Sequence, residues 1–198
     1  PLFTAFQGMD AFFHAAEGYI ANVTTPLSEI YSLESIRLLS TNLHKAVVDG
    51  NDLEARTKVA WASTLSGMVI ATSSCISQHS LEHAMSAYYP TLPHGAGLIA
   101  LSLAYFSHFV YDVPERYIKM AEVMTGKKVT DPNEFIHALA AMLTRCRVDS
   151  IKLSDYGIKS SDLPHFVTNA TETMGKLFEY DPQKLTKEEK LDIYCKSF

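Results

Sequence analysis

The segment from residue 26 to residue 48 restricts the fold of this chain more than any other part of the sequence. Its apolar residues recur three or four positions apart, at Ile30, Leu33, Ile36, Leu39, Leu43 and Val47. This spacing is typical of an amphipathic α-helix with one apolar face. Thr25 followed by Pro26 is a suitable start for the helix, and residues 49–52 contain the Gly and Asn that end one. The pattern therefore predicts a long helix that needs neighbouring elements to cover its apolar face.

The rest of the chain repeats helical patterns and shows no segment with convincing strand alternation. Further helices are predicted over 4–20, 53–72, 76–88, 97–110, 114–124, 131–145 and 162–174. Residues 153–158 have the composition of a loop, and Thr186 with Glu189 forms a capping box ahead of a short terminal helix. The fold class that follows is all-α, a multi-helix, bundle-like domain.

The second half of the predicted helix 53–72 is dominated by small residues, including Gly67. A glycine inside a helix costs about 1 kcal/mol relative to alanine. Close approach of another helix is the usual compensation, and we expect that neighbour to be the helix that carries Asp10.

Length, charge and cysteine content exclude several classes of protein. The 198 residues suit one domain, and a net charge of −5 gives no support to nucleic-acid or anionic-membrane binding. No apolar run approaches the ~20 residues that a membrane-spanning helix requires. Three cysteines that lie far apart fit reduced thiols and a cytoplasmic location. No glycine-rich dinucleotide loop of the G-x-G-x-x-G type follows a strand.

Histidines are concentrated between residues 79 and 94. His79 and His83 are four residues apart and share a helix face, and His94 follows after the Pro90 and Pro93 break. Imidazole is the commonest metal ligand in proteins. The alternative interpretation is that these histidines are incidental polar residues on a helix surface. This stretch alone does not decide between metal binding and that alternative.

Asp10 and His14 form a second pair with the same spacing, on a helix rich in phenylalanine. A carboxylate and an imidazole four residues apart can reach one ion, although such pairs also occur as simple surface hydrogen bonds. Together with His79, His83 and His94, the chain offers one carboxylate and four imidazoles for a metal.

Three motifs in the same order resemble those of the iron-containing (group III) alcohol dehydrogenases, which have the dehydroquinate-synthase-like fold. Residues 8–19 resemble the G-x-D-A-x-x-H-x-x-E-x-Y segment of that family, residues 79–83 its H-x-x-x-H, and residues 93–95 its P-H-G. The similarity extends over essentially the whole chain. One departure is the eleven-residue step from His83 to His94, which is one longer than the commoner spacing and could reshape the substrate pocket.

The resemblance implies a role for each of these side chains. Asp10, His14, His79 and His94 would be the metal ligands, and His83 would lie beside the metal, near the bound nicotinamide, as a proton relay. Residues 1–198 would then be the helical, metal-binding catalytic domain. The N-terminal α/β domain that binds the nucleotide in this family has no counterpart here, so we expect the chain alone to be inactive.

The implied chemistry is transfer of hydride between a small alcohol or aldehyde and NAD or NADP, promoted by Fe(II) or Zn(II). A homo-oligomer is possible. A metal-dependent hydrolase is the first alternative, but helical phosphohydrolases need a His-Asp dipeptide, which the sequence lacks. A helical interaction domain without redox activity is the second alternative, and stoichiometric metal would separate it from an enzyme.

Overall fold

The computed structural model describes residues 1–198 and contains helices and no strands. The order of its elements is α1 (Leu2–Ile20), α2 (Pro26–Val48), α3 (Leu53–Thr72), α4 (Ser77–Tyr88), α5 (His94–Phe109), α6 (Pro114–Thr125), α7 (Glu134–Arg145), α8 (Leu163–Met174) and α9 (Lys187–Lys196). Short 3₁₀ helices cover Leu153–Tyr156, Ser160–Asp162 and Gly175–Tyr180. The predicted all-α class is confirmed.

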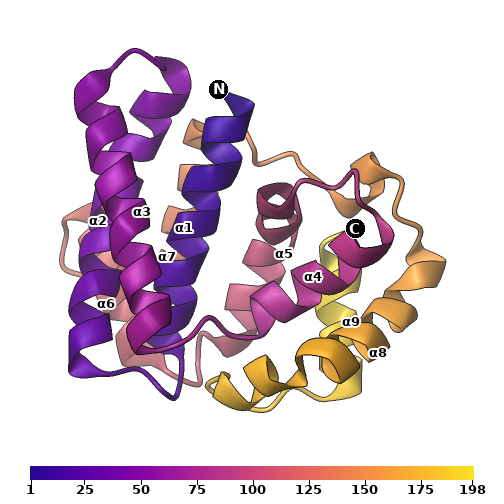
Figure 1. Cartoon of the computed structure of the whole chain (residues 1–198). Coiled ribbons are helices and arrows are strands. Elements are labelled where there is room, and N and C mark those ends of the chain that lie inside the picture. Colours follow the sequence, from indigo (N-terminus) through magenta and orange to yellow (C-terminus); the bar gives the residue numbers. More distant parts are fainter.

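Two groups of helices pack on opposite sides of α1 (Figure 1). Helices α2 and α3 lie against α1 and against each other, while α5 contacts α1 from the other side. Helix α4 packs on α5 and α8, and α9 closes that group. One continuous apolar core joins the two groups, with Phe12, Phe13 and Phe106 among its fully buried side chains. Helix α1 is therefore the central element of the fold.

The predicted caps account for several of the observed helix ends. The Thr25 side chain accepts a hydrogen bond from the Ser28 amide, and Asp52 accepts one from the Ala55 amide. Thr186 and Glu189 form the predicted capping box at the start of α9. Gly126 ends α6 with a φ of 68°, a conformation that glycine adopts without strain.

Three sequence-based predictions were wrong in detail. The predicted loop at 153–158 contains a 3₁₀ helix over Leu153–Tyr156. Helix α5 begins at His94, not at residue 97, because Pro93 is compatible with a helix start and serves as its N-cap. Ile30 is 65% exposed, since the nine residues to Leu39 turn the helix by about 900° and place the two side chains on opposite faces.

The expected close helix approach at Gly67 was also wrong. A Cβ added at Gly67 would meet no atom within 4 Å. The close approaches occur elsewhere: a Cβ at Gly18 would run into Val69 of α3, and one at Gly95 would run into the backbone of Phe6. Gly67 instead borders a pocket between α1 and α3.

No single helix has both the length and the apolar character to cross a bilayer. Helices α3 and α4 meet that standard only when taken together, and they are bent by 104° where they meet.

Candidate metal centre

Helix α1 supplies the first two side chains of the candidate site. Asp10 and His14 occupy successive turns, and both are only partly buried, whereas Phe12 and Phe13 between them are fully buried. The helix therefore directs its phenylalanines into the core and this polar pair toward the neighbouring α4 and α5.

Helix α4 supplies His79 and His83, and two carboxylates from distant elements fix its start. Its N-cap residue, Ile76, has no side chain that can accept a hydrogen bond. The Ile76 amide donates to Oε2 of Glu17 at 2.7 Å, and the Ser77 amide donates to Oδ1 of Asp181 at 3.1 Å. Carboxylates at a helix N-terminus satisfy unpaired amides and interact favourably with the helix dipole.

Helix α5 supplies His94 as its first residue. The next residue, Gly95, lies so close to α1 that a Cβ would overlap the carbonyl group of Phe6. Direct contact between the two backbones brings His94 to Asp10, although the two residues are 84 positions apart in the sequence.

One oxygen atom, Oδ1 of Asp10, lies at the centre of the cluster. It is 3.1 Å from Nδ1 of His14, 3.3 Å from Nε2 of His79 and 3.5 Å from Nε2 of His94. The His14 and His79 rings are 4.0 Å apart between centroids, and the His79 and His94 rings 5.4 Å. The four side chains that the resemblance names as ligands therefore converge on one point.

The Nδ1 atom of each of these three imidazoles has an oxygen acceptor. Nδ1 of His79 donates to Oε1 of Glu17 at 2.5 Å, and Nδ1 of His94 donates to Glu82. Nδ1 of His14 lies 3.0 Å from the backbone carbonyl of Asp10. Because an ionised carboxylate only accepts, the contacts of His79 and His94 favour the tautomer whose Nε2, the atom directed at Asp10, keeps its lone pair. His14 differs, since its Nδ1 faces both the carbonyl and Oδ1 of Asp10. Imidazoles held in this way are typical metal ligands.

The cluster concentrates negative charge that needs a cation nearby. Glu17 and Glu82 are fully buried, and Asp10 adds a third carboxylate. Burial raises the pKa of Asp10, but hydrogen bonds from His14, His79 and His94 outweigh burial and hold this pKa well below its usual range. The carboxylate of Asp10 is therefore ionised at neutral pH.

The carboxylates act on the imidazoles of His79 and His94 in the opposite sense. Burial lowers the pKa of His79, but Glu17 and Asp10 outweigh burial and raise it to about 10. Burial likewise lowers the pKa of His94, while Asp10 and Glu82 raise it to about 9. The site thus draws protons onto atoms that could otherwise bind a metal ion.

His83 stands at the exposed edge of the cluster. Its ring is 6.3 Å from that of His79 and 5.1 Å from that of His94. Burial, followed by the influence of His94 and His79, lowers its pKa, although Glu82 acts against them. Glu82, His83 and His94 also lie close enough to form a second potential ligand group beside Asp10, His14 and His79. All five predicted site residues are therefore neighbours, and proximity alone does not assign the ligands.

The sequence-based prediction missed Glu17 and Glu82. Both lie three residues after a histidine on the same helix, Glu17 after His14 and Glu82 after His79. That spacing places acid and imidazole on one face, and Glu17 also occupies the E of the G-x-D-A-x-x-H-x-x-E-x-Y segment. Glu17 in fact bonds to His79, which is 62 residues away, so its partner depends on the packing of α4 against α1.

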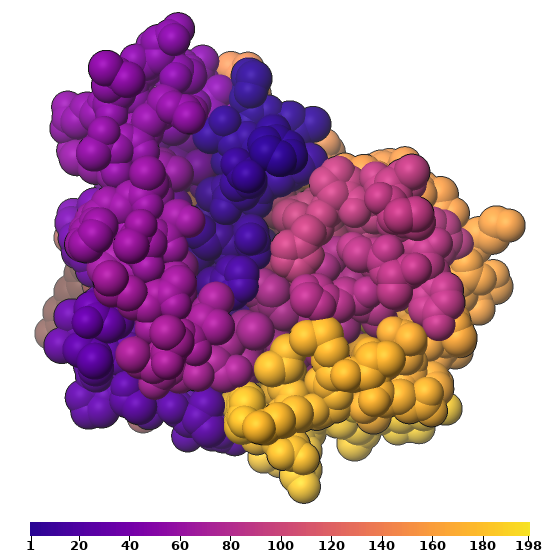
Figure 2. Space-filling model, in the orientation of Figure 1, coloured from indigo at the N-terminus to yellow at the C-terminus, as the bar shows by residue number.

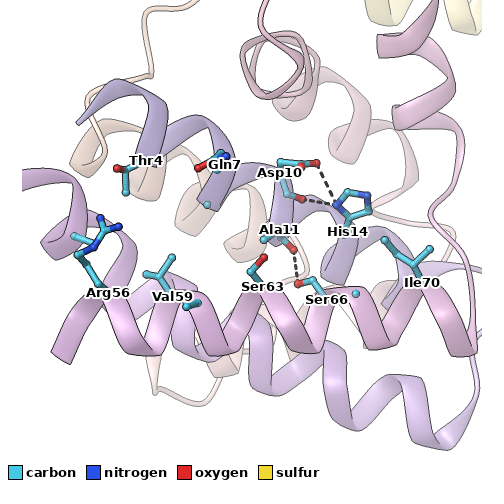
Figure 3. A pocket seen from close by; sticks show the side chains of 14 residues that line it. Thr4, Gln7, Asp10, Ala11, His14, Arg56, Val59, Ser63, Ser66 and Ile70 are labelled. Atoms are coloured by element: carbon cyan, nitrogen blue, oxygen red, sulfur yellow. Dashed lines mark hydrogen bonds and ion pairs between the residues drawn. The ribbon is translucent and has the colours of Figure 1, made fainter. Parts of the chain in front are cut away.

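A pocket of about 490 Å³ opens beside the cluster, between α1 and α3 (Figure 3). Asp10 and His14 form part of its lining, and Arg56 lies at the opposite end. On the molecular surface, a hollow lies between α1 and α3 (Figure 2).

Comparisons with known proteins agree with this arrangement. A model of the Fe-containing alcohol dehydrogenase family, C-terminal part, matches residues 4–198. The chain is 32% identical to 1,3-propanediol dehydrogenase of Klebsiella pneumoniae, covering 98% of this chain and 51% of that protein. It is 30% identical to alcohol dehydrogenase 4 of Saccharomyces cerevisiae, covering 100% of this chain and 51% of that protein.

Solved structures of alcohol dehydrogenases have the same helical arrangement. An archaeal alcohol dehydrogenase from a Red Sea brine pool matches with a TM-score of 0.95 at 28% identity, covering all of this chain and 51% of its own. A 1,3-propanediol oxidoreductase matches with a TM-score of 0.92 at 28% identity, covering all of this chain and 52% of its own. The chain spans about half the length of the relatives it matches.

Proposed function

Because the chain belongs to the Fe-containing alcohol dehydrogenase family, we propose that it is the metal-binding half of an enzyme that interconverts alcohols and aldehydes with NAD or NADP. The observation that carries this proposal is the convergence of three imidazoles on Oδ1 of Asp10. We assign Asp10, His14, His79 and His94 as the ligands of Fe(II) or Zn(II).

The dimensions of the cluster fit a transition metal. Ligand atoms at about 2.1 Å from a tetrahedral metal are about 3.4 Å from one another. Oδ1 of Asp10 lies 3.3 Å from Nε2 of His79 and 3.5 Å from Nε2 of His94. One carboxylate and neutral imidazoles form a donor set that suits both iron and zinc.

The charge of the cluster supports the same assignment. With neutral imidazoles, Asp10, Glu17 and Glu82 would leave three negative charges in a largely buried volume. Such charges are strongly unfavourable unless a cation compensates them. A divalent ion would compensate two of them, and it would replace the protons that His79 and His94 otherwise bind.

A bound divalent metal would supply Lewis acidity toward the alcohol oxygen, which promotes hydride loss from carbon. The residues of the chain hold the reacting groups in place. Glu17 and Glu82 fix the orientation of His79 and His94, and the α1–α3 pocket holds the carbon chain of the substrate. His83, at the exposed edge of the cluster, accepts the hydroxyl proton in oxidation and returns it in reduction.

The nucleotide site belongs to the part of the enzyme outside residues 1–198 in this proposal, because no glycine-rich phosphate loop occurs in the sequence. Hydride transfer depends on holding donor carbon and nicotinamide in contact. Residues 1–198 alone are therefore expected to produce no NAD(P)H from alcohols.

Metal analysis tests the proposal directly. After loading with Fe(II) or Zn(II) and removal of free metal, the protein should retain about one ion per chain. His94→Ala should lose most of this metal, whereas His137→Ala, at a 70% exposed histidine far along the chain from the cluster, should retain it. Equal metal content in the wild type and both variants, or none in the wild type, would contradict the assignment.

A further inference from the structure

The pocket between α1 and α3 is held open by small side chains on α3. Ala60, Ser63 and Gly67 line it, and none of them is large enough to fill the space toward α1. The Ser66 hydroxyl donates to the carbonyl of Ala11 at 2.7 Å and lies 2.8 Å from the Ser35 hydroxyl of α2. These buried hydrogen bonds join α3 to α1 and α2 beside the pocket.

The chemistry of the lining changes along the pocket. Asp10, His14 and Ile70 line the end nearest the metal centre, while Thr4 and Arg56 line the opposite end (Figure 3). Arg56 is the only lysine or arginine of the lining. The pocket thus has a candidate metal at one end and a guanidinium group at the other.

Arg56 is an exposed residue at the end of the pocket and forms no ion pair, unlike Arg37 of α2 and Lys58 of α3. Arg37 is paired with Glu34, and Lys58, two residues further along α3, is paired with Glu54. An unpaired guanidinium beside a pocket can bind a carboxylate, sulfonate or phosphate through two parallel hydrogen bonds.

The length of the pocket limits the size of the ligand. Ser66 of α3 lies beside Ala11, next to Asp10, and Arg56 is ten residues before it, which corresponds to about 15 Å along the helix axis, part of which the long Arg56 side chain can span. A ligand that reached from the metal centre to Arg56 would therefore be longer than a two- or three-carbon alcohol.

The geometry points to an anionic-tail subsite: Arg56 binds a carboxylate or similar anion at the far end of an alcohol or aldehyde substrate whose reacting carbon lies beside Asp10 and His14. This inference rests on the proposed function, because the reacting end is defined by the metal centre. The preferred substrates are medium-length ω-hydroxy acids and their aldehydes, and neutral alcohols of equal length are poorer substrates.

Kinetics of the complete, metal-loaded enzyme test the subsite with 6-hydroxyhexanoate and 1-hexanol as a matched pair. Arg56→Ala should lower kcat/KM for 6-hydroxyhexanoate by about tenfold or more, as expected for loss of a hydrogen bond to a charged group. The value for 1-hexanol should change by less than about twofold, as is usual for surface substitutions. Lys58→Ala is the control, since it removes a cation from the same helix outside the pocket lining. Arg56→Glu should reverse the preference and favour 6-amino-1-hexanol.

A binding measurement separates failure of the subsite from failure of the proposed function. Hexanoate cannot be oxidised as an alcohol, and its affinity for the complete protein, measured by calorimetry, should fall about tenfold in Arg56→Ala. If Arg56→Ala loses affinity for hexanoate while the wild-type enzyme oxidises neither 6-hydroxyhexanoate nor 1-hexanol, the subsite is retained and the dehydrogenase proposal is contradicted. If the enzyme oxidises 1-hexanol normally but Arg56→Ala changes neither the affinity for hexanoate nor kcat/KM for 6-hydroxyhexanoate, the subsite is overturned.

Discussion

The two histidines of α4 have different surroundings although they are only one helical turn apart. His79 is buried, bonds to Glu17 through Nδ1 and directs Nε2 at Asp10. His83 is exposed and has no comparable partner. The difference supports the proposal that His79 binds the metal and His83 moves a proton.

Substituting each histidine separately tests these roles. His79→Ala removes a ligand. Loss of a residue that only supports a ligand lowers metal affinity by up to about 100-fold, so His79→Ala should lower it by more. His83→Ala should retain nearly stoichiometric metal and lower kcat of the complete enzyme by about 10²–10⁴-fold, the usual contribution of a general acid–base group. Metal competition assays and steady-state kinetics provide the two measurements. If His83→Ala loses its metal and His79→Ala keeps it, the ligand is one turn further along α4.

The motifs of the sequence were sufficient to nominate the five side chains that meet in the structure. Asp10 with His14 and His79 with His83 are each encoded by a four-residue spacing on one helix, which is a local signal. The pairings of Glu17 with His79 and of Glu82 with His94 are not local, because they depend on how α1, α4 and α5 pack. The sequence therefore predicted the candidate ligands and missed the residues that hold them.

At the level of elements, the start of α5 decides where His94 lies. Gly95 lets the first turn of α5 touch the Phe6 backbone, where no side chain can move aside to make room for a Cβ. Gly67 is the opposite case, since its surroundings are open. Periodicity placed Gly67 inside a predicted helix and left Gly95 just before another, because an apolar pattern does not reveal which neighbour a helix end or face meets.

Replacing each of these glycines with alanine should change stability in opposite directions. Gly95→Ala should lower the free energy of unfolding by about 1–3 kcal/mol through overpacking, and it should weaken metal binding because His94 is displaced. Gly67→Ala should raise the free energy of unfolding by about 0.5–1 kcal/mol, since alanine is the better residue inside a helix. Urea unfolding of the metal-free protein measures both values. A Gly95→Ala variant as stable as the wild type would contradict the direct contact between α5 and α1.

Across the whole molecule, Asp181 links the C-terminal segment to the helix that carries the candidate metal ligand. Its Oδ1 accepts hydrogen bonds from the Ser77 amide and from the Tyr105 hydroxyl, and its backbone carbonyl accepts one from the Asn22 side chain. Asp181 therefore joins α4, α5 and the turn after α1 to a part of the chain about one hundred residues beyond Ser77. Nothing in the turn-like Asp181-Pro182 pair predicted this, because all three partners are distant in sequence.

The burial of Asp181 predicts a pH dependence of folding. Burial raises its pKa to about 7, although Ser77 and Tyr105 donate hydrogen bonds that lower it, whereas an unfolded aspartate titrates near 3.8. Between these values the folded state binds the proton that the unfolded state has lost. The contribution of Asp181 to stability is therefore fully present below about pH 4 and is lost as the pH rises toward 7, at up to about 1.4 kcal/mol per pH unit.

The Asp181→Asn variant isolates this contribution from other titrating groups, because asparagine stays neutral at all these pH values. The free energy of unfolding should be compared for the two proteins by urea unfolding at pH 5 and pH 8, with metal removed by a chelator. At pH 8 the wild type contains a buried, ionised carboxylate. The free energy of unfolding of the variant, relative to that of the wild type, should therefore be higher at pH 8 than at pH 5. A constant difference would mean that Asp181 is ionised throughout, with the Ser77 amide and Tyr105 hydroxyl stabilising its charge fully despite burial.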